Sequence, residues 1–396
     1  MSQKISLKME NAVMNKPIYM EYLSELINAQ LENRKPQDIP AQIDIDKLVQ
    51  IAHENHIDYL ILGSLLKLPL GQERIDEFRP FMLYSTMKTL QQVREVELLQ
   101  DSFEKEGIRN QVLKGAVMKH IYPRPEMREM SDIDFMIYED SLDHADRVMQ
   151  SFGYGQGNAI KHHTIYKKNP YLVAEMHWSL YEQTVDKEQY LYYKNQFRAV
   201  LKEGKQYTYE FSKEDFYVYM ISHAAKHFYE NGCGIRNLLD VYIFKEKYGQ
   251  VLDYEKISKE LERCGITDFE YHISKLAYIW MKHQESTEFH NNLFLYMMDC
   301  GIYGKSQNGI WGQLAKQTST HGKAGKLKFY FPPRQYMQEY YPFLEKWGIL
   351  LPLTWCMRGI KGFKKESLDR AKMVQDEDNI AKMEEIYGAL KLDFHK

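Results

Sequence analysis

The sequence predicts an α+β fold in which a small mixed β-sheet lies between an N-terminal helical region and a C-terminal helical domain. Three observations support this prediction. Residues 82–106 form a long run without glycine or proline, with apolar residues near helical spacing. Short β-like segments gather between about residues 108 and 180. From Phe211 onward the pattern is again mostly helical and rich in tyrosine and phenylalanine.

A chain of 396 residues is long enough for two or three domains. The changes in pattern place the boundaries at 1–106, 107–205 and 206–396. In the first region, amphipathic or apolar helical segments begin near Ile43 and Tyr59.

The central region alternates short strands with short helices. Residues 110–113 are β-like and run through Lys114 and Gly115 into a helical pattern, after which Pro123 and Pro125 mark a loop. The later elements are expected in this order: a strand at 132–138, a helix at 142–152, and strands at 161–168 and 171–180 joined by a turn at Asn169-Pro170.

Two acidic residues stand in an otherwise apolar strand pattern. Asp132 and Asp134 are followed at once by Phe135-Met136-Ile137. Residues i and i+2 of a strand point to one face, so both carboxylates should project together. Like charges this close repel, and burying them is costly unless positive charge lies between them. A divalent cation such as Mg²⁺ or Mn²⁺ meets that need, whereas a pair of solvated acids at a strand end is the alternative.

A third acid follows on a later strand pattern. Glu175 lies within an apolar segment, and His177, two residues on, shares its face. If this strand lies beside the Asp132 strand, three carboxylates meet and can hold two metal ions. Such a site suits phosphoryl or nucleotidyl transfer. His162 and His163 lie in the strand pattern before Glu175. Either one of them faces the same cleft or both are exposed strand histidines, and the two alternatives are equal.

The segment Leu113-Lys114-Gly115 is a strand that enters a helix through glycine. Glycine lets the backbone approach a ligand closely, and a helix N-terminus attracts phosphate. Lys114 adds positive charge there. Alone, a glycine at such a junction is usually only a turn.

Together these motifs resemble the nucleotidyltransferase superfamily of the DNA polymerase β type, most closely a bacterial, uncharacterised branch of it. That branch has an LKG motif, an arginine shortly before a DIDxxI-like strand, an E-x-H-W strand, and a helix with paired histidines followed by an arginine and an LD pair. The matching residues here are Leu113-Lys114-Gly115, Arg128, Asp132-Ile133-Asp134, Glu175-Met176-His177-Trp178, His223, His227, Arg236 and Leu239-Asp240. The resemblance covers about residues 43–248.

The resemblance implies transfer of a nucleoside monophosphate from a nucleoside triphosphate to a hydroxyl acceptor, with release of pyrophosphate. It implies that Asp132, Asp134 and Glu175 are catalytic and bind Mg²⁺ or Mn²⁺. The acceptor is an unidentified small molecule or protein. Residues expected to bind the nucleotide are Lys114, Gly115, Arg128, His177, His223, His227, Arg236 and Asp240.

Two pairs on the downstream helices have other interpretations. His223 and His227 are four residues apart and share a helix face, so they would suit Zn²⁺, but no further ligand cluster accompanies them. A structural pair, or contacts to the nucleotide or acceptor, is favoured. Arg236 and Asp240 have the same spacing and would pair with each other on a helix.

Two other functions stay open, and the first of them follows from a departure from the superfamily pattern. The superfamily glycine is usually followed by a serine that contacts the terminal phosphates, whereas Ala116 follows Gly115 here. A non-catalytic nucleotide-binding or regulatory protein on the same fold is therefore the second hypothesis. The third is a phosphotransferase that uses a similar metal site to move the γ-phosphoryl group.

Composition narrows the partners and the compartment. The formal net charge of −3 disfavours tight binding to long nucleic acid. The four cysteines are widely separated, which suits a reducing cytoplasm. The first residues lack the apolar stretch of a signal peptide, and no transmembrane segment is predicted. The short apolar run at 347–357 favours a buried C-terminal helix over contact with a membrane surface.

Overall fold

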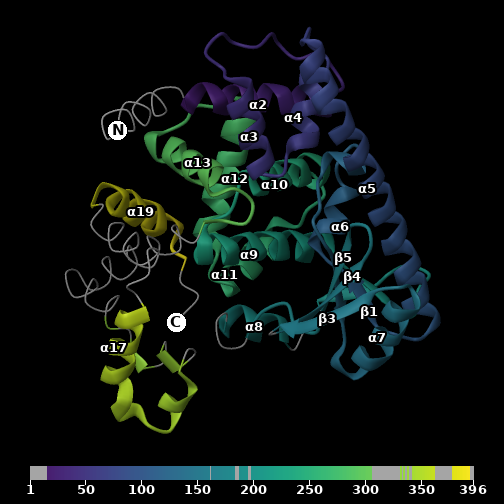
Figure 1. Ribbon diagram of the computed structural model, residues 1–396, viewed down its shortest axis with the longest axis vertical. Coiled ribbons are helices and arrows are strands. Elements are labelled where there is room, and N and C mark those ends of the chain that lie inside the picture. The colour runs from purple at the N-terminus through teal and green to yellow at the C-terminus, as the bar shows by residue number, and fades with distance from the viewer. Residues whose placement is uncertain are drawn as a thin grey trace.

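A computed structural model describes residues 16–160, 162–182, 187–194, 198–305, 331, 333–334, 337–338, 341–361 and 377–392. It contains one seven-stranded mixed sheet. Helices precede and follow the strands in the sequence and surround the sheet in space (Figure 1). The predicted α+β class, a mixed sheet between helical regions, is confirmed.

The strands are arranged in the order β3-β4-β5-β2-β1-β7-β6. Two neighbouring pairs are parallel, β2 with β5 and β1 with β7, and the other pairs are antiparallel. The bounds are β1 Asn110–Val112, β2 Ile133–Ile137, β3 Gly155–Ile160, β4 His163–Lys168, β5 Leu172–His177, β6 Ala199–Leu201 and β7 Thr208–Phe211.

The helices before the sheet gather at one end of the molecule, and α5 runs along its edge from them to the sheet (Figure 1). The bounds up to the last strand are α2 Lys16–Leu31, α3 Ile45–Glu54, α4 Asp58–Leu65, α5 Gln72–Lys105, α6 Lys114–Lys119, α7 Leu142–Ser151 and α8 Lys187–Lys194. After the sheet come α9 Lys213–Asn231, α10 Arg236–Tyr248, α11 Tyr254–Arg263, α12 Thr267–Lys282, α13 Glu288–Cys300, α17 Leu351–Lys361 and α19 Glu377–Leu390.

One face of the sheet is covered by α5 and α7. Ile133, Phe135 and Ile137 of β2 are fully buried in a core that also takes Ala174 and Met176 of β5. The helices contribute Val96, Leu99, Phe103, Ala145, Val148 and Met149 to this core. Alternate residues of each strand are therefore fixed on this face, and the residues between them must point to the other.

The opposite face is covered only in part. A small cluster around Leu113, Met136, Tyr181, Tyr193 and Tyr219 packs there. Tyr219 belongs to α9, whose start is fixed by Ser212, because the Ser212 side chain accepts a hydrogen bond from the backbone N–H of Asp215. Helix α9 therefore lies over the face that carries the even-numbered residues of β2.

The structure differs from the sequence-based expectation in four elements. Strand β3 and the β6–β7 pair were not anticipated, because β3 and β6 are edge strands without an alternating apolar pattern. Helix α5 begins at Gln72, before the expected 82, and passes through Pro80. An internal proline usually ends a helix pattern, which explains the shorter prediction.

The largest core joins helices from both ends of the chain. It contains Leu23 and Leu60 from the N-terminal helices together with Phe228, Leu239 and Trp280 from the helices after the sheet. The predicted boundaries at 106 and 205 stay a prediction.

The expectation of a buried helix at 347–357 is wrong for most of its apolar side chains. Helix α17 forms there, but Trp347, Ile349 and Leu353 are 62%, 87% and 53% exposed. Among the described residues, no helix has both the length and the apolar character needed to cross a bilayer.

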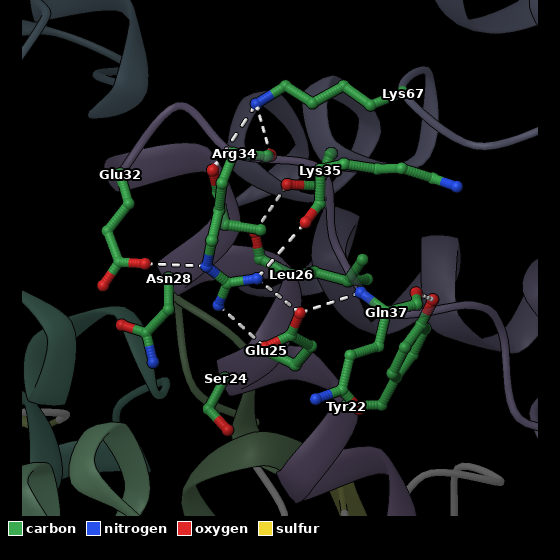
Figure 2. A network of polar contacts seen from close by, with 12 residues as sticks. Tyr22, Ser24, Glu25, Leu26, Asn28, Glu32, Arg34, Lys35, Gln37 and Lys67 are labelled. Carbon is green, nitrogen blue, oxygen red and sulfur yellow. Dashed lines mark hydrogen bonds and ion pairs between the residues drawn. The ribbon is translucent and has the colours of Figure 1, made fainter.

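A polar network holds the loop after α2 (Figure 2). Arg34 donates from Nη1 and Nη2 to the two carboxylate oxygens of Glu25, at 2.6 and 2.8 Å. The same carboxylate accepts the backbone N–H of Gln37 at 2.9 Å, while Lys67 of the loop after α4 donates to the carbonyl of Arg34 at 3.1 Å. These contacts tie the loop after α2 to α2 itself and to the segment after α4, and the bonds from Arg34 hold the pKa of Glu25 below its usual range.

Replacing Glu25 with Gln should destabilise the protein by about 1 kcal/mol at pH 7, because two charge-assisted bonds weaken while the shape is kept. A lowered pKa in the folded state means that Glu25 stabilises the fold above the carboxyl's unfolded pKa. That contribution is lost as the pH falls through the folded pKa. Urea unfolding at pH 7 and in mild acid should therefore show the variant's deficit shrinking in acid. Glu21→Gln, at an exposed position of the same helix, is the control and should change little. A Glu25→Gln deficit that is equal at both pH values would contradict this account.

Candidate active site

The parallel pairing of β2 and β5 brings the predicted acids together. In the register of this pair, Asp134 lies opposite Glu175. Both residues fall between the core positions of their strands, so their side chains project from the face away from α5 and α7. Asp132 precedes β2 by one residue and lies two residues before Asp134.

His177 completes this group. It lies two residues after Glu175, and its Nε2 atom is 3.3 Å from Asp134 Oδ1 and 3.4 Å from Glu175 Oε2. One ligand atom from each of Asp134, Glu175 and His177 lies within 4.8 Å of the other two. The structure therefore places two carboxylates and one imidazole at a spacing that can hold one metal ion.

The charges at this site are strongly coupled. Burial raises the pKa of Asp132 to about 7, and repulsion from Asp134 and Glu175 adds to the effect. Burial alone would lower the pKa of His177, but its contacts with Asp134 and Glu175 outweigh this and raise the pKa to about 9. The acids thus hold a positive charge between them, which is the condition that the sequence pattern predicted.

The donor set fits a divalent metal. Carboxylate oxygens suit Mg²⁺ and Mn²⁺, and the imidazole nitrogen of His177 favours Mn²⁺ over Mg²⁺. Asp134, Glu175 and His177 are the described residues whose ligand atoms come together for such an ion, and Asp132, two residues before Asp134, is not part of that group of three.

A second histidine group adjoins the acids. Strand β4 pairs with β5 so that His163 lies opposite His177, and His163 Nε2 is 3.6 Å from Glu175 Oε2. Nitrogen atoms of His162, His163 and His177 lie within 4.8 Å of one another. Of the two open interpretations for this histidine pair, the register favours His163 facing the cleft. The sequence did contain a signal for this placement, because two strands joined by the Asn169-Pro170 turn should pair antiparallel.

Helix α9 carries the predicted pair His223 and His227 across from the acids. Their Nε2 atoms are 3.3 Å apart. The pKa of His223 is well below its usual value, through burial and the charges of His227 and Lys114. The pKa of His227 is lowered in the same direction although its side chain is more exposed, and Asp134 opposes this shift. The two imidazoles are therefore neutral at neutral pH. In the described part of the chain, neither His223 nor His227 belongs to a group of three metal-ligating side chains.

The glycine junction is anchored to the acid strand. The Leu113 N–H donates to the Asp134 carbonyl at 3.0 Å, and α6 begins at the next residue. A Cβ atom on Gly115 would come within 2.9 Å of Met130 Sδ. Glycine therefore lets α6 pack closely against Met130, and any larger residue at this position would require the Met130 side chain to shift.

The remaining predicted residues form a buried ionic network around Asp240. Arg128 donates to both Asp240 oxygens, at 3.2 Å from Nε and 3.0 Å from Nη2, and Lys114 Nζ is 3.6 Å from Oδ2. Tyr122 donates its hydroxyl to Asp240 at 2.9 Å. Burial raises the pKa of Asp240, but Arg128 and Lys114 outweigh this and lower it to about 2.

Arg236 does not take the partner expected from its spacing. Its Nη1 donates to the carbonyl of Glu129 at 3.1 Å, whereas Asp240 bonds to Arg128 and Tyr122. Against the effect of burial, the charge of Asp240 nevertheless acts to raise the pKa of Lys114, Arg128 and Arg236, so three cations interact electrostatically with this carboxylate. The charge of Asp132 also raises the pKa of Arg128. The network therefore leaves positive potential beside the first of the acids.

Replacing Asp240 with Asn should cost about 3–5 kcal/mol of unfolding free energy, because it leaves Arg128 and Lys114 buried without their counter-charge. Urea or thermal unfolding measures this. Asp38→Asn is the control, since Asp38 is 86% exposed and pairs with Lys35 only at 3.8 Å. Equal stability of the two variants would show that the network has no structural role.

Comparison with known proteins agrees with this arrangement. A sequence model of a family described as uncharacterised nucleotidyltransferase matches residues 41–282, more than half of the chain. The match extends from just before α3 to the end of α12 and includes the whole sheet. No curated protein and no solved structure is significantly similar to the chain. The chain belongs to the uncharacterised nucleotidyltransferase family.

Proposed function

We propose that the protein is a metal-dependent nucleotidyltransferase that moves a nucleoside monophosphate from a nucleoside triphosphate to a hydroxyl acceptor and releases pyrophosphate. The observation that carries the proposal is the position of Asp134 directly opposite Glu175, with Asp132 two residues before it. Family membership supports the same reaction class.

In this proposal Asp132, Asp134 and Glu175 bind Mg²⁺ or Mn²⁺, which when bound neutralises phosphate charge and lowers the pKa of a hydroxyl. Glu175 completes the metal site that activates the acceptor hydroxyl, and the proton of that hydroxyl passes to solvent. The acceptor oxygen then bonds to the α-phosphorus, and the bond from that phosphorus to the bridging oxygen breaks. His177 orients Asp134 and Glu175 through its contacts with both.

The phosphates are proposed to lie toward the Asp240 network. Lys114 and Arg128 are only 6% and 4% exposed and are held by Asp240, so they act chiefly through the potential they create. Arg236 and the neutral His223–His227 pair add hydrogen-bond donors on the α9 and α10 side. Gly115 permits the close packing that sets this side of the site.

The acceptor is proposed to be a small molecule or a protein side chain. A formal net charge of −3 provides no broad attraction for long nucleic acid. A cytoplasmic location remains a proposal that rests on the separated cysteines, of which Cys233, Cys264 and Cys300 are buried.

Replacing both Asp132 and Asp134 with Asn should abolish transfer, with a loss of at least about 100-fold, because the charges that hold the metal are removed. The protein is offered each α-³²P-labelled nucleoside triphosphate with Mg²⁺ or Mn²⁺ and an acceptor pool from a cell extract. Label transfer and pyrophosphate release are then measured. Asp143→Asn, at an exposed position of α7 on the far face of the sheet, is the control and should retain wild-type turnover.

The same assay separates the alternatives. Transfer that persists in the Asp132→Asn/Asp134→Asn protein would exclude this site as the catalyst. A nucleoside diphosphate as product, without pyrophosphate, would identify the γ-phosphoryl transferase instead. Binding of nucleotide without any turnover would favour the non-catalytic protein that Ala116, in place of serine, suggests.

A further inference from the structure

A cavity of about 620 Å³ opens beside the acids on the same face of the sheet. Met136 lines its floor, and Met136 lies two residues after Asp134 on β2 and opposite His177 on β5. Two residues of strand span about 7 Å. The cavity therefore begins next to the proposed metal site, at the C-terminal ends of β2 and β5.

Three residues that line the cavity carry buried polar atoms that lack a hydrogen-bond partner among the described residues. The Nε2 atom of Gln111 and the hydroxyl of Tyr193 are two of them, and these residues are 2% and 8% exposed. The Nε–H of Arg198 is a third. A buried donor without a partner costs free energy, so three such atoms on residues that line one cavity favour a ligand with hydrogen-bonding atoms there.

Aromatic side chains form other parts of the wall. Trp178, Tyr190, Tyr193 and Phe211 all line the cavity. Tyr193 is held by stacking on Tyr181, with ring centroids 5.3 Å apart and planes 17° apart. Flat, fixed rings of this kind suit a planar ligand that can stack on them.

The residues that line the cavity supply no excess positive charge for phosphate. Its two cations, Lys194 and Arg198, are matched by two acids, Glu139 and Asp140. Arg198 is already bonded to Glu260. An uncharged ring with hydrogen-bond acceptors fits such a wall, whereas the excess positive charge lies at the other end of β2, around Asp240.

We propose that this cavity binds the nucleobase of the triphosphate substrate, with Gln111 and Arg198 donating to acceptor atoms on the base edge. The inference rests on the proposed function, which it deepens by placing the base. Phosphates would lie toward the N-terminal end of β2 and the base toward its C-terminal end. Gln111 then sets base preference, because its amide can discriminate between base edges.

Equilibrium binding to the full chain with Mg²⁺ tests the proposal, using calorimetry with the four nucleoside triphosphates and inorganic tripolyphosphate. We expect wild-type protein to bind one base about 10-fold or more tighter than another. Gln111→Leu keeps the volume but removes the donor. It should weaken the preferred nucleotide about 10-fold, level the four affinities, and leave tripolyphosphate within about twofold.

Two further variants keep the test decisive. Tyr193→Phe removes only the unpartnered hydroxyl, and it serves as the test if Gln111→Leu does not fold. It should weaken binding of the nucleotide but not binding of tripolyphosphate. Gln150→Leu, at an exposed position of α7, is the control and should bind as wild type.

The proposal is overturned if neither Gln111→Leu nor Tyr193→Phe changes nucleotide affinity, or if both weaken tripolyphosphate equally. Loss of nucleotide and tripolyphosphate binding in Asp134→Asn reports separately on the metal and phosphate site. If that loss occurs while the cavity variants bind normally, the base site fails and the proposed function stands. If wild-type protein binds neither the nucleotides nor tripolyphosphate, both the base site and the proposed function fail.

Discussion

The candidate site depends on one constraint, the register between the parallel strands β2 and β5. Ile133, Phe135 and Ile137 are locked into the core on one face, and their partners Ala174 and Met176 lie in that core too. Because side chains alternate, the core positions alone decide that Asp134 and Glu175 meet on the other face. A shift of β5 by one residue would bury Glu175 and His177 under α5 and α7, at a prohibitive cost for charged groups. The hydrophobic core thus determines the electrostatics of the site.

The connection between the two strands adds to this effect. Parallel neighbours need a crossover, and here it consists of α7 followed by β3 and β4. Because β4 returns antiparallel to β5, it delivers His163 opposite His177 and within 3.6 Å of Glu175. The β2–β5 pairing places His177 against Asp134 and Glu175, and the β4–β5 pairing adds His163. The raised pKa of His177 then gives the two carboxylates a positive charge between them.

Much of this arrangement is visible in the sequence because it is local. The alternation in residues 132–138 predicted both the strand and the shared face of its acids, and Glu175 and His177 were predicted in the same way. The Asp240 network was not predictable, since Arg128 and Asp240 are 112 residues apart. Spacing favoured an Arg236–Asp240 pair, but Arg128 and Tyr122 lie within hydrogen-bond distance of Asp240 instead. The edge strands β3 and β6 were missed because strands without a buried face lack a clear period.

The distribution of charge along β2 gives the site a direction. Before the strand, Arg128 connects the three-cation network to Asp132, and after Asp134 the charge-matched cavity with its aromatic walls begins at Met136. A nucleotide has the same polarity, with a highly charged phosphate end and a neutral, flat base. Reversing it would place phosphates against Glu139 and Asp140 and leave the network's positive potential facing a neutral ring. The match between these two gradients, rather than any one side chain, is what favours a nucleotide over a simple phosphate or an uncharged metabolite as the ligand of this face.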